Sequence, residues 1–115
     1  MDQSILDEVK KLLGFTPDYT EFDKDLVILI NSTFSVLTQL GVGPNSGFMI
    51  TGSTSTWGEF VTDTRLTMVK AYVFIKAKLQ FDVAAQTSYV INSLSDQAKE
   101  YEWRLLVASE EIKDV

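Results

Sequence analysis

The stretch TMVKAYVFIKAKLQFD, residues 67–82, decides the fold class because it reads as a helix with apolar side chains on every side. At about 100° per residue, Val73 and Phe81 share one face, while Tyr72 and Leu79 lie on other faces. Such a helix needs neighbours on several sides, and either its own chain or a partner can supply them. The pattern leaves both alternatives open.

Two helices are predicted on the N-terminal side of this stretch. The first begins at a cap, Asp2 or Ser4, and ends at Gly14, where a glycine commonly follows the last helical residue. The second runs from Thr20, which stands three residues before Asp23 in a weak variant of the capping box, to Leu40 and the glycine after it. Residues 57–61 are expected to form a short helix.

A last helix is predicted to begin near Thr87 or Ser88, and residues 109–115 are predicted to form a polar, mobile tail after it. Six of its residues make a one-sided apolar stripe, namely Val90, Leu94, Ala98, Tyr101, Leu105 and Ala108. The chain is therefore expected to be all-α, a bundle of about four helices in a single domain over residues 1–115.

The segment VGPNSGFMITGSTST, residues 42–56, is predicted to be a long loop because it carries glycine and proline and little helical pattern. Loops of this length in small domains are usually functional or disordered. Phe48, Met49 and Ile50 have no obvious place in a four-helix core, and so we expect this loop at a contact between subunits.

Composition excludes several classes of protein. The chain has 115 residues with no cysteine and no histidine, which removes disulfides, thiolate metal sites and the usual catalytic base. Its net charge of -6 would repel a phosphate backbone. The N-terminus lacks the pattern of a signal peptide, and the longest apolar run, residues 26–30, is too short to span a bilayer.

Each motif with a chemical interpretation fails a specific test. Residues 47–54, GFMITGST, have phosphate-loop spacing but place Ser53 where the lysine must stand, and the glycines of residues 41–47 follow a helix instead of a strand. The acids of residues 18–25 lack the glycine and closing glutamate of a calcium loop, and favourable interaction with a helix N-terminus explains them. We therefore expect no catalytic residue, cofactor or metal.

A surplus of large apolar side chains remains. The chain is 45% hydrophobic and 11% aromatic, and Trp103 and Leu106 project away from the stripe of the last helix. Aromatic residues concentrate at interface hot spots. The sequence therefore predicts self-association or a stable protein partner.

Several features in order resemble the phage head–tail connector family, also called adaptor or head-completion proteins. They are the opening LDEVKKLLGF, the helix end LTQLGV, Trp57 with Phe60, the helix VKAYVFIKAKLQFD, and YEWRLLVA near the end. Val83 and Ala84 stand where the family typically has prolines, which changes the turn chemistry because valine does not fix φ.

The resemblance implies a structural virion protein without catalysis, assembled in the host cytoplasm. Its partners would be other copies in a ring of about twelve subunits, the capsid portal, and the next connector, stopper or tail component. DNA would pass through the channel without specific binding, and no membrane is involved. The C-terminal end would dock on the portal, through Glu110, Glu111, Ile112, Lys113, Asp114 and Val115.

Two further sets of residues complete these expectations. The predicted subunit interface consists of Phe48, Met49, Ile50, Trp57, Tyr72, Trp103 and Leu106. The loop over residues 42–56 is expected at a subunit contact or at the rim of the channel. Asp82 and Arg104 are expected to pair, because a charge near apolar surface is costly without a partner. The alternative function is an acidic DNA mimic that inhibits a nucleic-acid-binding protein, which would need its carboxylates gathered in rows on one surface.

Overall fold

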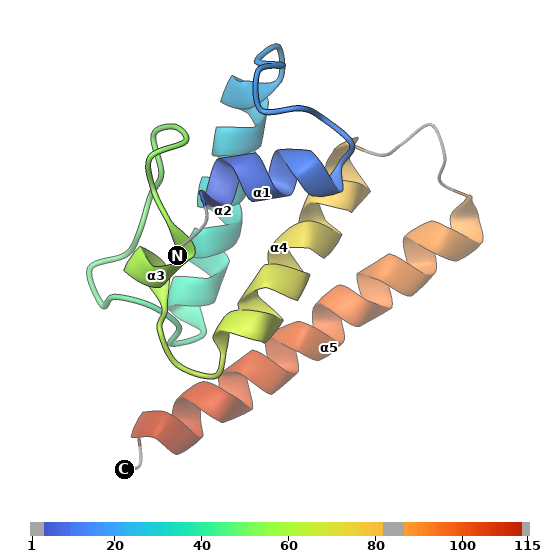
Figure 1. Ribbon diagram of the computed structural model, residues 1–115. Coiled ribbons are helices and arrows are strands. Elements are labelled where there is room, and N and C mark those ends of the chain that lie inside the picture. Colours follow the sequence, from blue (N-terminus) through green and yellow to red (C-terminus); the bar gives the residue numbers. More distant parts are fainter. Residues whose placement is uncertain (1–3, 82–86, 114–115) are drawn as a thin grey trace.

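The computed structural model describes residues 4–81 and 87–113, which form five helices and no strand (Figure 1). An isolated antiparallel bridge joins Ser4 and Thr56. The predicted all-α class is confirmed. The helices are α1 (Ile5–Leu12), α2 (Asp23–Gln39), α3 (Trp57–Phe60), α4 (Leu66–Phe81) and α5 (Ser88–Lys113).

The helix apolar all round, α4, lies at the centre of the bundle. It contacts α1, α2 and α5, and α5 runs alongside it at the edge of the molecule (Figure 1). These neighbours bury side chains from several sides of α4, namely Val69, Tyr72, Val73, Ile75 and Ala77. The subunit itself therefore supplies the cover that the pattern of α4 requires.

The predicted ends of the first two helices are mostly confirmed. The Ser4 hydroxyl caps α1 by accepting a hydrogen bond from the Asp7 amide at 3.2 Å, and Gly14 has a φ of 90° after the helix. Gly41, with a φ of 93°, follows α2 in the same way. The predicted cap at Thr20 is wrong, because α2 begins at Asp23 without a side-chain cap.

A cluster of aromatic rings accompanies that later start of α2. Phe15 lies 5.4 Å from Tyr19 and 5.7 Å from Phe22, measured between ring centroids. The Phe22 ring in turn contacts Phe81 at the end of α4, with centroids 6.3 Å apart. These contacts stabilise the turns before α2 through interactions that a local capping rule does not include.

A buried charge on α1 also links this helix to the start of α2. The Lys10 side chain is 1% exposed, and its ammonium lies 2.9 Å from a carboxylate oxygen of Asp23. The same ammonium donates a hydrogen bond to the Pro17 carbonyl at 2.9 Å. The charge is thus paired and hydrogen-bonded, as burial requires.

The loop over residues 42–56 packs onto the bundle through Phe48 and Ile50, contrary to the expectation that they lack a place in the core, whereas Met49 is exposed. Ile50 is 1% exposed, and the Phe48 ring lies 5.3 Å from Phe34 and 5.4 Å from Phe60. The Asn31 side chain donates to the Ile50 carbonyl at 3.0 Å and accepts from the Ile50 amide at 2.7 Å. This pair of bonds fixes the loop to α2.

The predicted short helix is confirmed as α3. Its N-terminus has a capping box in which the Thr56 amide donates to the Glu59 carboxylate at 3.0 Å. The helix places Trp57 and Phe60 in the core, where both side chains are buried.

The boundary predicted at residue 109 is wrong, because α5 continues through Lys113. Ser109 is 2% exposed, and its hydroxyl accepts a hydrogen bond from Arg65 at 2.8 Å. The polarity of Ser109 predicts an exposed tail, but the hydrogen bond from the buried Arg65 guanidinium satisfies the Ser109 hydroxyl within the packed helix. The last two residues, 114–115, lie outside the described part of the chain.

Candidate assembly interface

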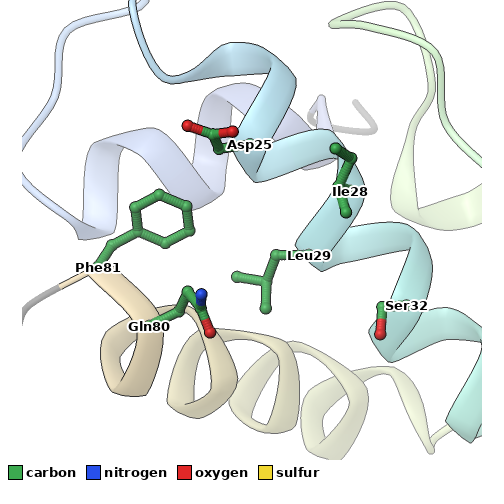
Figure 2. A pocket seen from close by; sticks show the side chains of 6 residues that line it. All are labelled: Asp25, Ile28, Leu29, Ser32, Gln80 and Phe81. Atoms are coloured by element: carbon green, nitrogen blue, oxygen red, sulfur yellow. The ribbon is translucent and has the colours of Figure 1, made fainter.

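Within residues 4–81 and 87–113 there is no group of three or more acidic residues that could hold a metal ion. No helix in these ranges is long and apolar enough to cross a membrane. A pocket of about 360 Å³ lies between α2 and α4, with Asp25, Ile28, Leu29 and Ser32 on one helix and Gln80 and Phe81 on the other (Figure 2). Among the described residues, the lining offers one carboxylate, Asp25, one hydroxyl, Ser32, and one amide, Gln80, and no basic side chain.

The surface with the clearest potential for association lies on α5. This helix packs chiefly on α4, so much of its circumference is not covered by the subunit. Its inner side is buried through Ala98, Leu105 and Ser109. Among the side chains of α5 that the structure describes, five large apolar ones are exposed elsewhere on the helix, namely Tyr89, Val90, Ile91, Trp103 and Leu106.

Three of the predicted interface residues are available to a partner. Met49 is 71% exposed, Trp103 is 65% exposed and Leu106 is 37% exposed. Trp103 and Leu106 lie on one helix, α5, whereas Met49 lies in the loop over residues 42–56. Gathered exposed apolar groups are typical of an interaction surface. Their assignment to a subunit contact remains a prediction.

The other four belong to the subunit's own core or its edge. Ile50, Trp57 and Tyr72 have exposures of 1%, 1% and 0%, and their side chains are therefore not accessible to another subunit in this conformation. Phe48 is partly buried against the core rings. The expectation of an interface role for the three buried residues is corrected, since an apolar sequence position does not reveal which neighbour covers it.

Asp82, the expected partner of Arg104, lies outside the described part of the chain, so this pairing stays a prediction. Arg104 donates a hydrogen bond to Glu100, one turn earlier on α5, at 3.0 Å. Both of these side chains are exposed, so their pairing contributes little to stability.

A polar contact that the sequence did not indicate joins α4 to α5. The buried Tyr72 hydroxyl donates a hydrogen bond to the Glu102 carboxylate at 2.7 Å. Burial raises the pKa of Tyr72 above its ordinary value, and the hydrogen bond to Glu102 raises it further. The phenol stays protonated as a donor and fixes the rotation of α5 about α4.

A second unforeseen contact lies at the other end of this helix pair. The Arg65 guanidinium donates to the Gly41 carbonyl at 3.1 Å and to Ser109 at 2.8 Å. Its two bonds to the Asp63 carboxylate, at 2.9 and 2.7 Å, hold the pKa of Asp63 below its ordinary value. Arg65 therefore connects the end of α2, the start of α4 and the end of α5.

Among the residues predicted to dock on a portal, Glu110 and Glu111 are exposed on α5. Residues 112 and 113 belong to the last turn of this helix, and residues 114–115 are outside the described part. The helix thus carries part of the predicted docking segment as ordered structure.

A family model described as phage connector protein matches residues 5–112. The match spans α1 to α4 and α5 up to residue 112, including the exposed apolar side chains of α5. No curated protein and no solved structure matches the chain significantly. Because the matched region covers nearly the whole chain, this protein belongs to the phage connector family.

Proposed function

We propose that the protein is a subunit of a homo-oligomeric ring that binds the capsid portal, extends the DNA channel and helps join head to tail. Membership of the phage connector family supports a structural role in the virion. The observation that carries the ring is the exposed apolar surface of α5, where Trp103 is 65% exposed. Moving a large apolar side chain from water into an interface contributes roughly 1.5–3 kcal/mol.

A ring also requires a heterologous contact, in which one patch of a subunit meets a different patch of the next. The long edge helix is suited to this because α4 covers one side of it and its other sides are exposed. By family resemblance the ring would contain about twelve subunits, matched to the portal. Assembly in the host cytoplasm would precede incorporation into the virion.

The charge of the chain is compatible with a DNA passage. A net charge of -6 repels phosphates, so DNA would move through such a channel without being held. The portal would be engaged by residues 110–115 at the end of α5, and the opposite side of the ring would meet the next connector, stopper or tail component.

The acidic surface gives less support to the alternative of a DNA mimic. Exposed carboxylates among the described residues lie on several separate elements, including the turn before α2, α2 itself, α3 and α5. A mimic needs carboxylates in phosphate-like rows on one surface, and this distribution does not favour such rows.

The proposal is tested by measuring the native mass of the purified chain alone and with the portal protein of the same phage. We expect a complex with many copies of the chain per portal ring. A Trp103→Ser variant should reduce the number of bound copies, whereas Ile28→Ser, at an exposed position of α2, should not. A chain that stays monomeric and binds no portal would contradict the proposal and favour the DNA mimic.

Docking through the C-terminal end needs its own variant. Removing residues 110–115 keeps Ser109 and its bond to Arg65, so the helical content should stay nearly unchanged. Co-sedimentation with the portal should fall strongly. Equal co-sedimentation of the shortened and full chains would exclude this segment from docking.

A further inference from the structure

A groove lies between α1, α4 and the N-terminal half of α5. Its volume is about 310 Å³, and its lining is mostly apolar, with Leu12, Leu13, Phe74 and Leu94 among the contributing side chains. Leu12 is 49% exposed. Pockets for small ligands start at roughly 300 Å³, so this groove has room for one or two large side chains but not for a whole helix.

A projecting pair of apolar side chains lies elsewhere on α5. Trp103 and Leu106 are three residues apart, which places them on one flank of the helix about one turn apart. We call this pair the knob. Aromatic side chains that enter a pocket on a partner are the usual anchors of protein interfaces.

The knob and the groove lie on opposite flanks of the same helix. Leu94 lines the groove, and Trp103 follows it by nine residues. At about 100° per residue, nine residues amount to two and a half turns, so the two side chains point in opposite directions. Two different patches on opposite sides of one subunit are what a ring of identical subunits needs, whereas docking on a portal needs only one.

The charges around the two patches are complementary. Lys78 is the one charged group among the described residues that line the groove, and the exposed Lys11 precedes Leu12. Four exposed charged residues lie on the flank of the knob, within about 60° of Trp103 around the helix: the acids Asp96, Glu100 and Glu110 and the base Lys99. Glu102 lies off this flank and is bound to Tyr72, and Glu100 is paired with Arg104. Glu110 is exposed one turn beyond Leu106 on the same flank. A basic groove edge therefore matches an acidic surface around the knob.

We infer that the knob of one subunit inserts into the groove of the next copy of this chain, and this inference rests on the ring proposed above. The pocket between α2 and α4 is one competing receptor (Figure 2), and a second, of about 540 Å³, lies between the start of α2 and residues 51–53 and carries both Asp23 and Lys24. The charged residue of the first pocket is Asp25, which would bring like charges together with the acidic surface around the knob. Charge therefore favours the groove over the pocket that contains Asp25.

Because the natural chain has no cysteine, single cysteines report this contact directly. Leu12→Cys marks the groove, Leu106→Cys marks the knob while leaving Trp103 in place, and Ile28→Cys marks both competing pockets at a residue that is 68% exposed. Pairs of full-length variants are mixed at high concentration, treated with a short bis-maleimide and separated by denaturing electrophoresis.

We expect the mixture of Leu12→Cys and Leu106→Cys to yield about tenfold more cross-linked dimer than either variant alone or than Ile28→Cys with Leu106→Cys, a ratio equivalent to about 1.4 kcal/mol. Adding Trp103→Ala to the knob variant should remove most of this dimer. A chain with both cysteines, at positions 12 and 106, should form a ladder of oligomers, as head-to-tail contacts require.

Two results would overturn the inference. One is efficient cross-linking of the Leu106→Cys variant to itself, which would show that the knobs of two subunits contact each other. The other is absence of the dimer between positions 12 and 106 even in chains assembled on the portal. Native mass with the portal separates the ring proposal from the proposed contact. A complete ring without this cross-link leaves the connector role intact and excludes only the insertion of the knob into the groove.

Discussion

The guanidinium of Arg65 lies 2.8 Å from the hydroxyl of Ser109, a residue 44 positions later in the chain. Arg65 is 9% exposed, and it also binds the Gly41 carbonyl and the Asp63 carboxylate. One side chain thereby determines how the start of α4, the end of α2 and the end of α5 meet. The position of the exposed surface of α5 depends on this connection.

Replacing Arg65 with Ala should lower the free energy of unfolding by about 2–3 kcal/mol, because it leaves the Ser109 hydroxyl and the Gly41 carbonyl without their charged donor. The matched control is Arg104→Ala, since Arg104 is exposed and bound only to an exposed Glu100 among the described residues. Arg104→Ala should lower the free energy of unfolding by no more than about 0.5 kcal/mol. Urea unfolding followed by circular dichroism measures both, and equal losses would refute the special role of Arg65.

The hydrogen bond between Tyr72 and Glu102 should make stability depend on pH in the alkaline range. Because the pKa of Tyr72 is raised in the folded chain, its contribution is fully present below the ordinary tyrosine pKa of 10.0 and is lost as the pH rises above that value. The free energy of unfolding should therefore fall above pH 10 more steeply for the natural chain than for Tyr72→Phe. Identical slopes from pH 9 to about pH 11 would contradict this assignment.

At neutral pH the same Tyr72→Phe variant keeps the ring in the core but removes the hydroxyl donor. We expect a loss of about 1.5–3 kcal/mol, the usual value of a hydrogen bond to a charged group. Chemical denaturation measures this loss, and Tyr89→Phe, at an 82% exposed position, is the control expected to change little.

The two hydrogen bonds between the Asn31 side chain and the Ile50 backbone should control the order of the loop over residues 42–56. In Asn31→Ala both bonds to the Ile50 backbone are lost, and the amide of Ile50 should exchange at least about tenfold faster, which corresponds to about 1.4 kcal/mol. Ser32→Ala, exposed on the same helix, is the matched control. Hydrogen exchange followed by mass spectrometry reads both variants, and unchanged exchange in Asn31→Ala would show that packing alone fixes the loop.

Two glycines of the same loop differ in a way that a pair of substitutions can detect. Gly43 and Gly47 have φ values of 86° and 90°, which cost an alanine roughly 1–2 kcal/mol of backbone strain. A Cβ at Gly43 would also overlap the Phe60 ring, whereas one at Gly47 meets no atom within 4 Å. Gly43→Ala should therefore destabilise the fold by at least about 1 kcal/mol more than Gly47→Ala. Equal thermal midpoints would show that Phe60 moves aside freely.

The sequence by itself determined the helical class and most of the helix ends. Those features depend on local chemistry, such as the Ser4 hydroxyl at the start of α1 and the positive φ of Gly14 and Gly41 after the first two helices. The even distribution of apolar residues in residues 67–82 also showed that this helix needed cover on several sides.

Only the tertiary structure decided which apolar residues are core and which are surface. Trp57 and Trp103 are both aromatic positions in the sequence, yet the first is 1% exposed and the second is 65% exposed. Likewise, the polar Ser109 belongs to the packed part of α5 because it meets Arg65, 44 residues earlier in the chain. The physical reason is that burial depends on neighbours brought together by the fold, whereas periodicity and capping record only neighbours along the chain.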